Sequence, residues 1–280
     1  MGLRDRGLEI KTPGQIELMR AAGLVVAETL ELARSSARAG MTTAELDQLA
    51  ETFIRDRGAI PSFVGVPGPP GAPDFPASLC LSVNDEVVHG IPGDRVLRDG
   101  DIVSIDCGAI VEGWHGDAAI TLGIGEISPS AVDLLEVCEE SLWRGMAAAR
   151  LGGHVTDISH AIESYVRGCS DFGVLEDYVG HGIGSSMHMP PNVPNVGRPG
   201  RGPRLVRGLA LAVEPMITAG TIDTAVLDDD WTVVTADGSL AAHFEHTFTL
   251  TDAGVWVLTA LDGGKARLGE LGVAYGGPTQ

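Results

Sequence analysis

Lysine is almost absent from this chain of 280 residues, and positive charge is scarce overall. Lysine occurs only at positions 11 and 265, arginine supplies the other basic residues, and the formal net charge is −19. Proteins are attracted to nucleic acids through basic surfaces. We therefore expect no DNA binding through a broad basic face.

The chain also lacks a long apolar run and a secretory leader. Hydrophobic residues make up 44% of the sequence, which is enough for a sizeable core. No stretch approaches the roughly 18 consecutive apolar residues of a membrane span. The first ten residues, MGLRDRGLEI, are charged and have no apolar signal segment. These absences predict a cytoplasmic protein without membrane association.

Cysteines are few, and common catalytic motifs are missing. The four cysteines, at positions 80, 107, 138 and 169, form no C-x-x-C pair, which is typical of reduced thiols and not of a structural zinc site. The sequence contains no H-E-x-x-H, G-x-S-x-G or G-x-x-x-x-G-K-[ST] motif. Ordinary zinc proteases, α/β-hydrolases and P-loop enzymes are thereby disfavoured.

What the chain does contain is an internal repeat. His-Gly-Ile occurs at residues 89–91 and again at residues 181–183. In each copy a later glycine opens an apolar segment that ends six residues on in an acid, Asp106 in the first copy and Glu214 in the second. Acids at matching points of a duplicated unit suggest two half-sites that face each other across a pseudo-twofold axis.

The first copy predicts a β-hairpin over residues 101–121, with its turn at Glu112-Gly113. This register makes Asp106 and Asp117 diagonal neighbours on one face, about 7–8 Å apart at the backbone. The alternative is a pair of surface acids. Asp106 follows an apolar strand, however, and a buried acid without a partner is costly. The pattern therefore favours metal ligands.

The second copy predicts another hairpin over residues 231–250, with its turn at 236–238. Its outgoing strand places His243 and Glu245 on one face, and Glu245 matches Asp117 of the first copy. His243 is either a further ligand or a residue behind the ligands. Four carboxylates brought together repel strongly unless cations lie between them. The repeat therefore predicts a site for two metal ions.

Helical patterns occur in two pairs, which points to an α+β fold with a sheet core. Capping signals at Thr12-Pro13 and Thr42 begin the first pair. The predicted helices cover residues 13–39, 42–58, 129–151 and 156–168. We expect one catalytic domain over residues 1–280, with pseudo-repeat halves at about 9–125 and 126–263, long loops at 64–76 and 189–204, and a weakly ordered tail at 264–280.

Four segments together resemble the type I methionine aminopeptidases, which are pita-bread metallopeptidases. They are SIDCG…HGDAAIT within 104–121, GHGIGSSMHMPPNVPN at 180–195, LAVEPMI at 211–217 and HFEHTFTL at 243–250. The resemblance covers roughly residues 9–263. It implies the pita-bread (creatinase/aminopeptidase) fold, with a central antiparallel sheet flanked by two pairs of helices. It also implies removal of the N-terminal methionine from nascent or newly made proteins whose second residue is small.

The resemblance also implies a role for particular residues. The implied metal ligands are Asp106, Asp117, His181, Glu214 and Glu245, with Asp117 and Glu245 bridging two ions. His89 and His188 would be catalytic histidines that also bind substrate, and Glu214 would be the general base. One imidazole and four carboxylates favour Co²⁺, Mn²⁺ or Fe²⁺, and Zn²⁺ is also compatible.

The methionine pocket is the part where this chain departs from the family pattern. Met187 stands where an aromatic residue is common, and residues 67–70 belong to an apparent insertion. The residues expected to form the pocket wall are Phe63, Phe75, Cys80, Met187 and Trp231. Each of them could instead be an ordinary core residue.

Two alternatives and one partner question stay open on sequence alone. The alternatives are an Xaa-Pro peptidase of the same fold and a binding protein that keeps the fold without catalysis. The implied substrate partner is the N-terminal methionine of nascent polypeptides, and a transient ribosome contact is the partner question. Residues 220–238 carry five aspartates and no basic residue, so we expect docking there to be weak. A monomer is the expected state.

Overall fold

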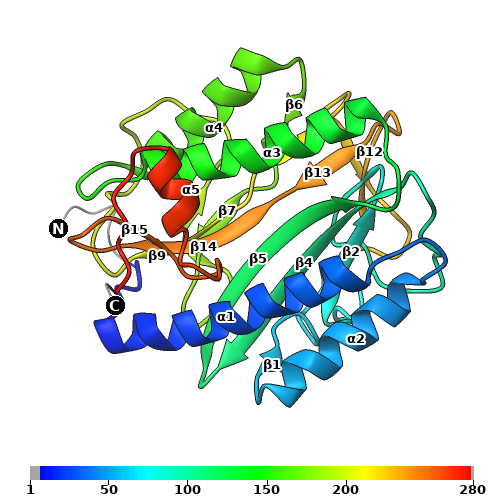
Figure 1. Ribbon diagram of the computed structural model, residues 1–280, viewed down its shortest axis with the longest axis horizontal. Coiled ribbons are helices and arrows are strands. Elements are labelled where there is room, and N and C mark those ends of the chain that lie inside the picture. Colours follow the sequence, from blue (N-terminus) through cyan, green and yellow to red (C-terminus); the bar gives the residue numbers. More distant parts are fainter. Residues whose placement is uncertain (1–6, 279–280) are drawn as a thin grey trace.

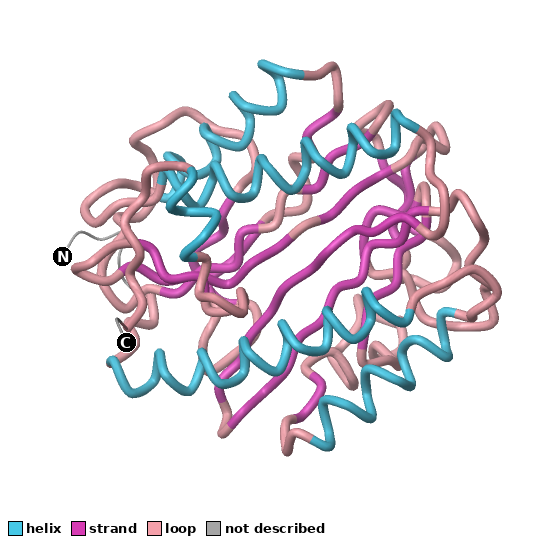
Figure 2. The backbone as a smooth tube through the Cα atoms, in the orientation of Figure 1, coloured by secondary structure: helices cyan, strands magenta, loops and turns pink. Residues whose placement is uncertain are grey.

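The computed structural model describes residues 7–278 and contains two pairs of long helices with strands between them (Figures 1 and 2). The helices are α1 (Pro13–Ser36), α2 (Thr43–Asp56), α3 (Pro129–Ala148) and α4 (Val155–Cys169), followed by the short α5 (Lys265–Glu270). Helices α1 and α2 belong to the first half of the chain, and α3 and α4 belong to the second half. This arrangement confirms the two predicted helix pairs.

The helix starts follow from local capping chemistry. Thr12 accepts a hydrogen bond from the backbone N–H of Gln15, and the Gln15 side chain accepts one from the Thr12 N–H. Thr42 and Glu45 form the same reciprocal pair at the start of α2. Such boxes satisfy N–H groups that have no partner within the helix, so they fix where each helix begins.

A nine-stranded antiparallel sheet forms the centre of the molecule. Its strands are β1 (Ile60–Pro61), β2 (Leu79–Val83), β4 (Ile102–Val111), β5 (Trp114–Gly123), β7 (Gly180–Gly182), β8 (Met189–Val193), β9 (Ala210–Val213), β14 (Glu245–Leu250) and β15 (Val255–Val257). Strand β5 of the first half pairs with β14 of the second half. The two halves therefore meet at the middle of one continuous sheet.

The first hairpin has the predicted register. Residues 111 and 114 are paired on either side of the turn, and Gly108 lies opposite Asp117. Glu112 and Gly113 have φ values of 49° and 82°. Positive φ at both central residues is the geometry of a type I′ turn, whose twist suits a two-residue hairpin.

The second predicted hairpin is wrong. Residues 233–235 (β12) pair with β11 (Thr224–Val226) and β3 (Glu86–Val88), whereas residues 241–243 (β13) pair with β10 (Met216–Thr218). Strand β6 (Gly173–Val174) completes the sheet of β10 and β13. The chain turns near residue 237 as expected, but each strand then finds a partner from another part of the sequence. Alternating polarity identifies a strand without identifying its neighbour.

The predictions for the second long loop and for the C-terminal tail also need correction. Strand β8 lies inside the predicted loop 189–204, whereas residues 64–76 contain no helix or strand, as expected. The predicted weakly ordered tail is structured over residues 265–278, because α5 buries Leu268 and Tyr275 forms a parallel bridge with Val255, whereas residues 279–280 lie outside the described residues. Apolar contacts therefore hold this segment against the domain.

The apolar core lies between the helices and the sheet. It includes Leu46, Ile105, Leu134, Ile158 and Phe248, each nearly inaccessible to solvent. Burial on the helix side leaves the other face of the central strands available for polar residues. Within residues 7–278, no helix combines the length and apolar character needed to cross a membrane.

Candidate metal centre

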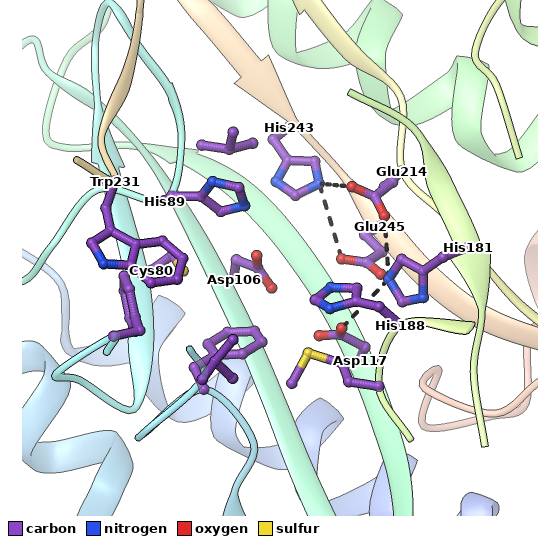
Figure 3. A pocket seen from close by; sticks show the side chains of 15 residues that line it. Cys80, His89, Asp106, Asp117, His181, His188, Glu214, Trp231, His243 and Glu245 are labelled. Atoms are coloured by element: carbon purple, nitrogen blue, oxygen red, sulfur yellow. Dashed lines mark ion pairs between the residues drawn. The ribbon is translucent and has the colours of Figure 1, made fainter. Parts of the chain in front are cut away.

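The five side chains predicted as metal ligands come from five segments of the central sheet and line a single cavity of about 70 Å³ (Figure 3). Asp106 comes from β4 and Asp117 from β5, both in the first half of the chain. His181 comes from β7, Glu214 follows β9, and Glu245 begins β14, all in the second half. The cavity therefore lies where the two halves meet.

Strand register explains why these residues converge. Asp106 and Glu245 are both aligned with Ala119, and Asp117 lies two residues before Ala119 on β5. On the other side of β14, His246 is aligned with Val213, the residue that precedes Glu214. Side chains two residues apart on a strand share a face, so all four carboxylates reach the same side of the sheet.

Burial makes the carboxylates strongly unfavourable as free anions. Asp117 and Glu245 are only 3% and 2% exposed. Burial raises the pKa of Asp106 to about 7. Burial and repulsion from neighbouring acids raise the pKa of Asp117, Glu214 and Glu245 well above the usual carboxyl range. These shifts are the ones expected for acids without a nearby cation.

The carboxylate oxygens also lack protein partners. Among residues 7–278, none donates a hydrogen bond to Asp106 Oδ1, Asp117 Oδ1 or Glu245 Oε1. Native proteins rarely leave buried polar atoms unsatisfied. Ligand atoms of Asp117, His181 and Glu245 lie within 4.8 Å of one another. The residues therefore fit a divalent cation both in chemistry and in spacing.

His181 is oriented toward the acids. Its Nδ1 lies 3.0 Å from the Gly182 carbonyl oxygen, an arrangement in which Nδ1–H donates. Its Nε2 then faces Glu214 Oε1 at 3.4 Å and Asp117 Oδ2 at 3.9 Å (Figure 3). A histidine whose far nitrogen is held by a backbone carbonyl is well placed to offer the other nitrogen to a metal.

His243, for which sequence analysis left two roles open, lies beside the acids. The side chain is 2% exposed, and its Nε2 lies 3.9 Å from Glu214 Oε2 and 4.0 Å from Glu245 Oε2. Burial lowers the pKa of His243 to about 3, so the imidazole is neutral near pH 7. His243 therefore contacts the carboxylates without being one of the three residues that converge within 4.8 Å.

The other two predicted histidines face the same cavity. His89 has a φ of 60°, a left-handed conformation in which histidine occurs more often than most residues. Its ring lies 6.1 Å from the Trp231 ring and points into the cavity toward the carboxylates (Figure 3). The His188 ring lies 4.5 Å from that of His181. Burial and nearby His188 lower the pKa of His89 to about 4, and burial lowers the pKa of His188.

An apolar wall closes one side of the cavity. Phe63, Phe75, Cys80 and Met187 form one buried cluster, and the partly buried Trp231 packs against it. The Phe75 ring meets Trp231 edge-on at 5.1 Å. All five predicted wall residues therefore lie together. Val66 and Val88 also line the cavity, and sequence analysis missed them because nothing in their spacing marks them.

Comparisons with known proteins agree with this geometry. Residues 17–252 match the model of metallopeptidase family M24. The methionine aminopeptidase of Clostridium acetobutylicum is 54% identical over 251 residues, which cover 89% of this chain and 98% of that protein. Methionine aminopeptidase 1 of Mycobacterium tuberculosis is 51% identical over 255 residues, covering 89% and 94% of the two chains.

Solved structures give the same result. The methionine aminopeptidase of Rickettsia prowazekii superposes with a TM-score of 0.86 at 39% identity, covering 90% of this chain and 99% of that chain. The prolidase of Pyrococcus furiosus, at 19% identity and a TM-score of 0.71, shares the fold only, and its alignment covers 92% of this chain and 66% of that chain.

The chain belongs to metallopeptidase family M24, whose members are metal-dependent hydrolases. Within that family it belongs to the methionine aminopeptidases, enzymes that remove an N-terminal methionine. This confirms the resemblance and the pita-bread fold inferred from the sequence. Family membership implies a divalent metal ion, and the buried group of Asp117, His181 and Glu245 could hold it.

Proposed function

We propose that this protein removes the first methionine from newly made polypeptides at a centre of two divalent metal ions. The proposed ligands are Asp106, Asp117, His181, Glu214 and Glu245, with Asp117 and Glu245 shared between the ions. The observation that carries the proposal is the convergence of carboxylates from both halves on one buried cavity, with oxygens to which no residue between 7 and 278 donates.

The donor set indicates the kind of metal. One imidazole and four carboxylates are hard ligands, which suit Mn²⁺, Fe²⁺ or Co²⁺ and accept Zn²⁺. Such cations, when bound, activate water by lowering its pKa from 15.7 toward about 7. All remaining steps depend on residues of the chain.

Glu214 is the proposed general base. Burial and repulsion from Asp106 raise the pKa of its carboxyl group, which favours proton uptake by this carboxylate. The Asn195 side chain donates to the Glu214 backbone carbonyl at 3.2 Å and is itself fully buried. Glu214 can therefore take a proton from the attacking water and return it to the leaving amine from a fixed position.

His89 and His188 are the proposed donors to the substrate amide. Their lowered pKa values keep both imidazoles neutral near pH 7, so each presents one N–H and one lone pair. A positioned donor of this kind contributes about 3–4 kcal/mol to transition-state stabilisation. The cluster around Phe75 and Met187 would hold the methionine side chain, since it is apolar and adaptable.

The cellular setting and assembly belong to the same proposal. Cys80, Cys107, Cys138 and Cys169 are all free thiols, which supports a reducing compartment such as the cytoplasm. We propose that the enzyme acts there on nascent chains, as a monomer, and that a small second residue is required.

The test is release of methionine from Met-Gly-Met-Met by metal-free protein titrated with Co²⁺ or Mn²⁺. We expect metal-dependent release from the wild type and none from Asp106→Ala. An Xaa-Pro peptide serves as the competing substrate. Cleavage of that peptide in place of Met-Gly-Met-Met, or no release by folded protein with any divalent metal, would overturn the proposal.

A further inference from the structure

Lys11 is one of only two lysines in the chain, and its side chain is 1% exposed. Its Nζ lies 3.3 Å from Glu9 Oε1 and donates to the Glu9 carbonyl at 3.2 Å. Burial of an ammonium group is costly unless it is paired. Glu9 provides that partner, so the buried ammonium group is paired with a carboxylate whose side chain is 28% exposed.

Glu9 also holds the tip of a loop that leads into the metal centre. The backbone N–H of Ser185 donates to Glu9 Oε1 at 3.1 Å, and the Ser185 hydroxyl donates to Glu9 Oε2. A Cβ at Gly184 would lie 2.1 Å from Glu9 Oε1 and 2.7 Å from Lys11 Nζ. The loop backbone at Gly184 therefore lies directly against the two side chains of the ion pair, and a larger residue there would displace their ends.

The two ends of this loop carry site residues. Gly182 pairs with Met189, so the loop spans residues 183–188. His181 lies just before it, and Met187 and His188 lie at its end, where they line the cavity. Ser185, which contacts Glu9, precedes His188 by three residues in this short loop. The contacts of Glu9 therefore hold the loop close to the point where His188 and Met187 enter the cavity.

Backbone hydrogen bonds also attach the residues near Lys11 and the 183–188 loop to the rest of the fold. The backbone N–H of Lys11 donates to the Gly208 carbonyl at 2.8 Å, and Gly184 O accepts from His115 N at 3.0 Å. These bonds do not depend on the side chains of residues 9 and 11. The ion pair therefore adds side-chain contacts with the loop to an attachment that the backbone already provides.

We infer that Glu9 and Lys11 are positioning residues that hold the 183–188 loop so that His188 meets the substrate. This inference rests on the proposed role of His188. Misplacement of a catalytic group by about 1 Å can reduce the rate about 100-fold. Loss of the pair should therefore lower kcat, while the five proposed metal ligands stay in place.

The experiment compares Glu9→Gln, Ser185→Ala and Lys11→Met with the wild type, with Mn²⁺ loaded. We expect kcat for Met-Gly-Met-Met to fall at least about tenfold in Glu9→Gln, while Mn²⁺ affinity changes less than about twofold. The losses of kcat in Glu9→Gln and Ser185→Ala should not add in the double variant, because both substitutions weaken the same contact between residues 9 and 185. The control is Glu31→Gln on α1. It removes an ion pair of similar length with Arg34, in which both side chains are exposed.

Ser185 is exposed, so its variant keeps the inference testable if the buried Lys11→Met fails to fold. Unchanged kcat in Glu9→Gln and Ser185→Ala would overturn the inference, and so would a parallel loss of Mn²⁺ affinity. If the wild type itself releases no methionine, the proposed function fails and not the positioning role.

Discussion

At the scale of single residues, the site is a set of buried like charges. Asp117 and Glu245 are almost inaccessible, and the pKa of each is raised by burial and by the neighbouring acids. Without cations, the folded protein can keep these acids buried together only if some of them bind protons. The same feature that suits the site to metal therefore makes it unfavourable for the metal-free protein.

Asp117→Asn tests this conflict between stability and binding. We expect Mn²⁺ affinity to fall at least about 100-fold, since a ligand is lost and even outer contacts contribute about 10- to 100-fold. The metal-free variant should unfold at the wild-type free energy or slightly above, because a neutral amide replaces a buried carboxyl group whose pKa is raised by burial and by neighbouring acids. Calorimetry of metal binding and of unfolding in EDTA measures both quantities.

The matched control for that variant is Asp133→Asn, at an exposed position on α3. It should leave both quantities unchanged. A large loss of stability in metal-free Asp117→Asn would show that the carboxylate serves the fold and not the metal.

The raised pKa values also set the pH dependence of metal uptake. Carboxyl groups must lose their protons to coordinate a metal. The pKa of Asp106 is raised to about 7 and the pKa values of Asp117, Glu214 and Glu245 are raised well above the usual carboxyl range, so the metal-free site holds protons at neutral pH. Mn²⁺ affinity should therefore rise from about pH 5.5 to about pH 8.

Proton release can be measured directly by repeating the Mn²⁺ titration at pH 7 in buffers with different ionisation enthalpies. We expect at least one proton to be released for each site filled. Uptake without proton release, or an affinity that falls with rising pH, would contradict the assignment of these carboxyl groups as the ligands.

At the scale of elements, α1 is held close to the turn that follows β15. Arg20 donates to the carbonyl oxygens of Leu258 and Ala260 at 2.6 Å each. Gly23 lies nearby, and a Cβ at this residue would be 2.3 Å from Leu258 O. The helix can approach so closely only because residue 23 has no side chain.

Gly23→Ala should accordingly destabilise the protein. Alanine is favoured over glycine in a helix by about 1 kcal/mol, but overpacking against backbone costs about 1–3 kcal/mol. Gly14→Ala, also in α1, is the control, since nothing lies within 4 Å of its added Cβ. Denaturant unfolding should show a loss for Gly23→Ala and a gain of up to about 1 kcal/mol for Gly14→Ala. Equal gains would show that α1 can shift away from Leu258.

The same elements show what sequence could predict about the fold. The N-cap at Thr12, the capping box at Thr42 and the turn at Glu112-Gly113 depend on residues within a few positions, so all three were predicted. Strand β12 instead pairs with the preceding β11 and the distant β3, and β13 pairs with β10, so the expected hairpin between β12 and β13 was wrong. Local chemistry fixes where elements begin, whereas packing decides which of them pair.

The residues of the site show the same contrast between periodic sequence signals and long-range packing. The internal repeat by itself predicts that Asp106, Asp117, Glu214 and Glu245 lie together, because strand alternation and duplication are periodic signals. His243 could not be assigned, since its distance from the acids depends on the turn of β13 into β14. The contact between Glu9 and Ser185 joins residues 176 positions apart, and no local pattern announces it.

At the scale of the whole molecule, neither half contains a complete centre. The first half supplies Asp106 and Asp117, the second supplies His181, Glu214 and Glu245, and the pairing of β5 with β14 joins them. Folding of the full domain is therefore required before the proposed metal ligands meet. This coupling makes metal affinity a measure of how well the two halves are joined.

The distribution of charge over the whole molecule bears on how it would meet nascent chains. The net charge is −19, and residues 220–238 hold five aspartates and no basic residue. Strand β11 in this segment lies at the edge of its small sheet, and Val226, Leu227 and Asp228 are exposed. Ribosomal RNA would repel such a surface.

We therefore expect no cosedimentation with ribosomes through residues 220–238 at about 100 mM salt, where charges are screened beyond about 10 Å. Reversing two charges, Asp228→Lys with Asp230→Lys, should increase binding, because two sites of repulsion become sites of attraction to phosphate. Asp133→Lys on α3 tests whether any added positive charge has the same effect. Wild-type cosedimentation that the double reversal weakens would mean that this acidic segment is itself a docking surface, with a basic protein and not RNA as its partner.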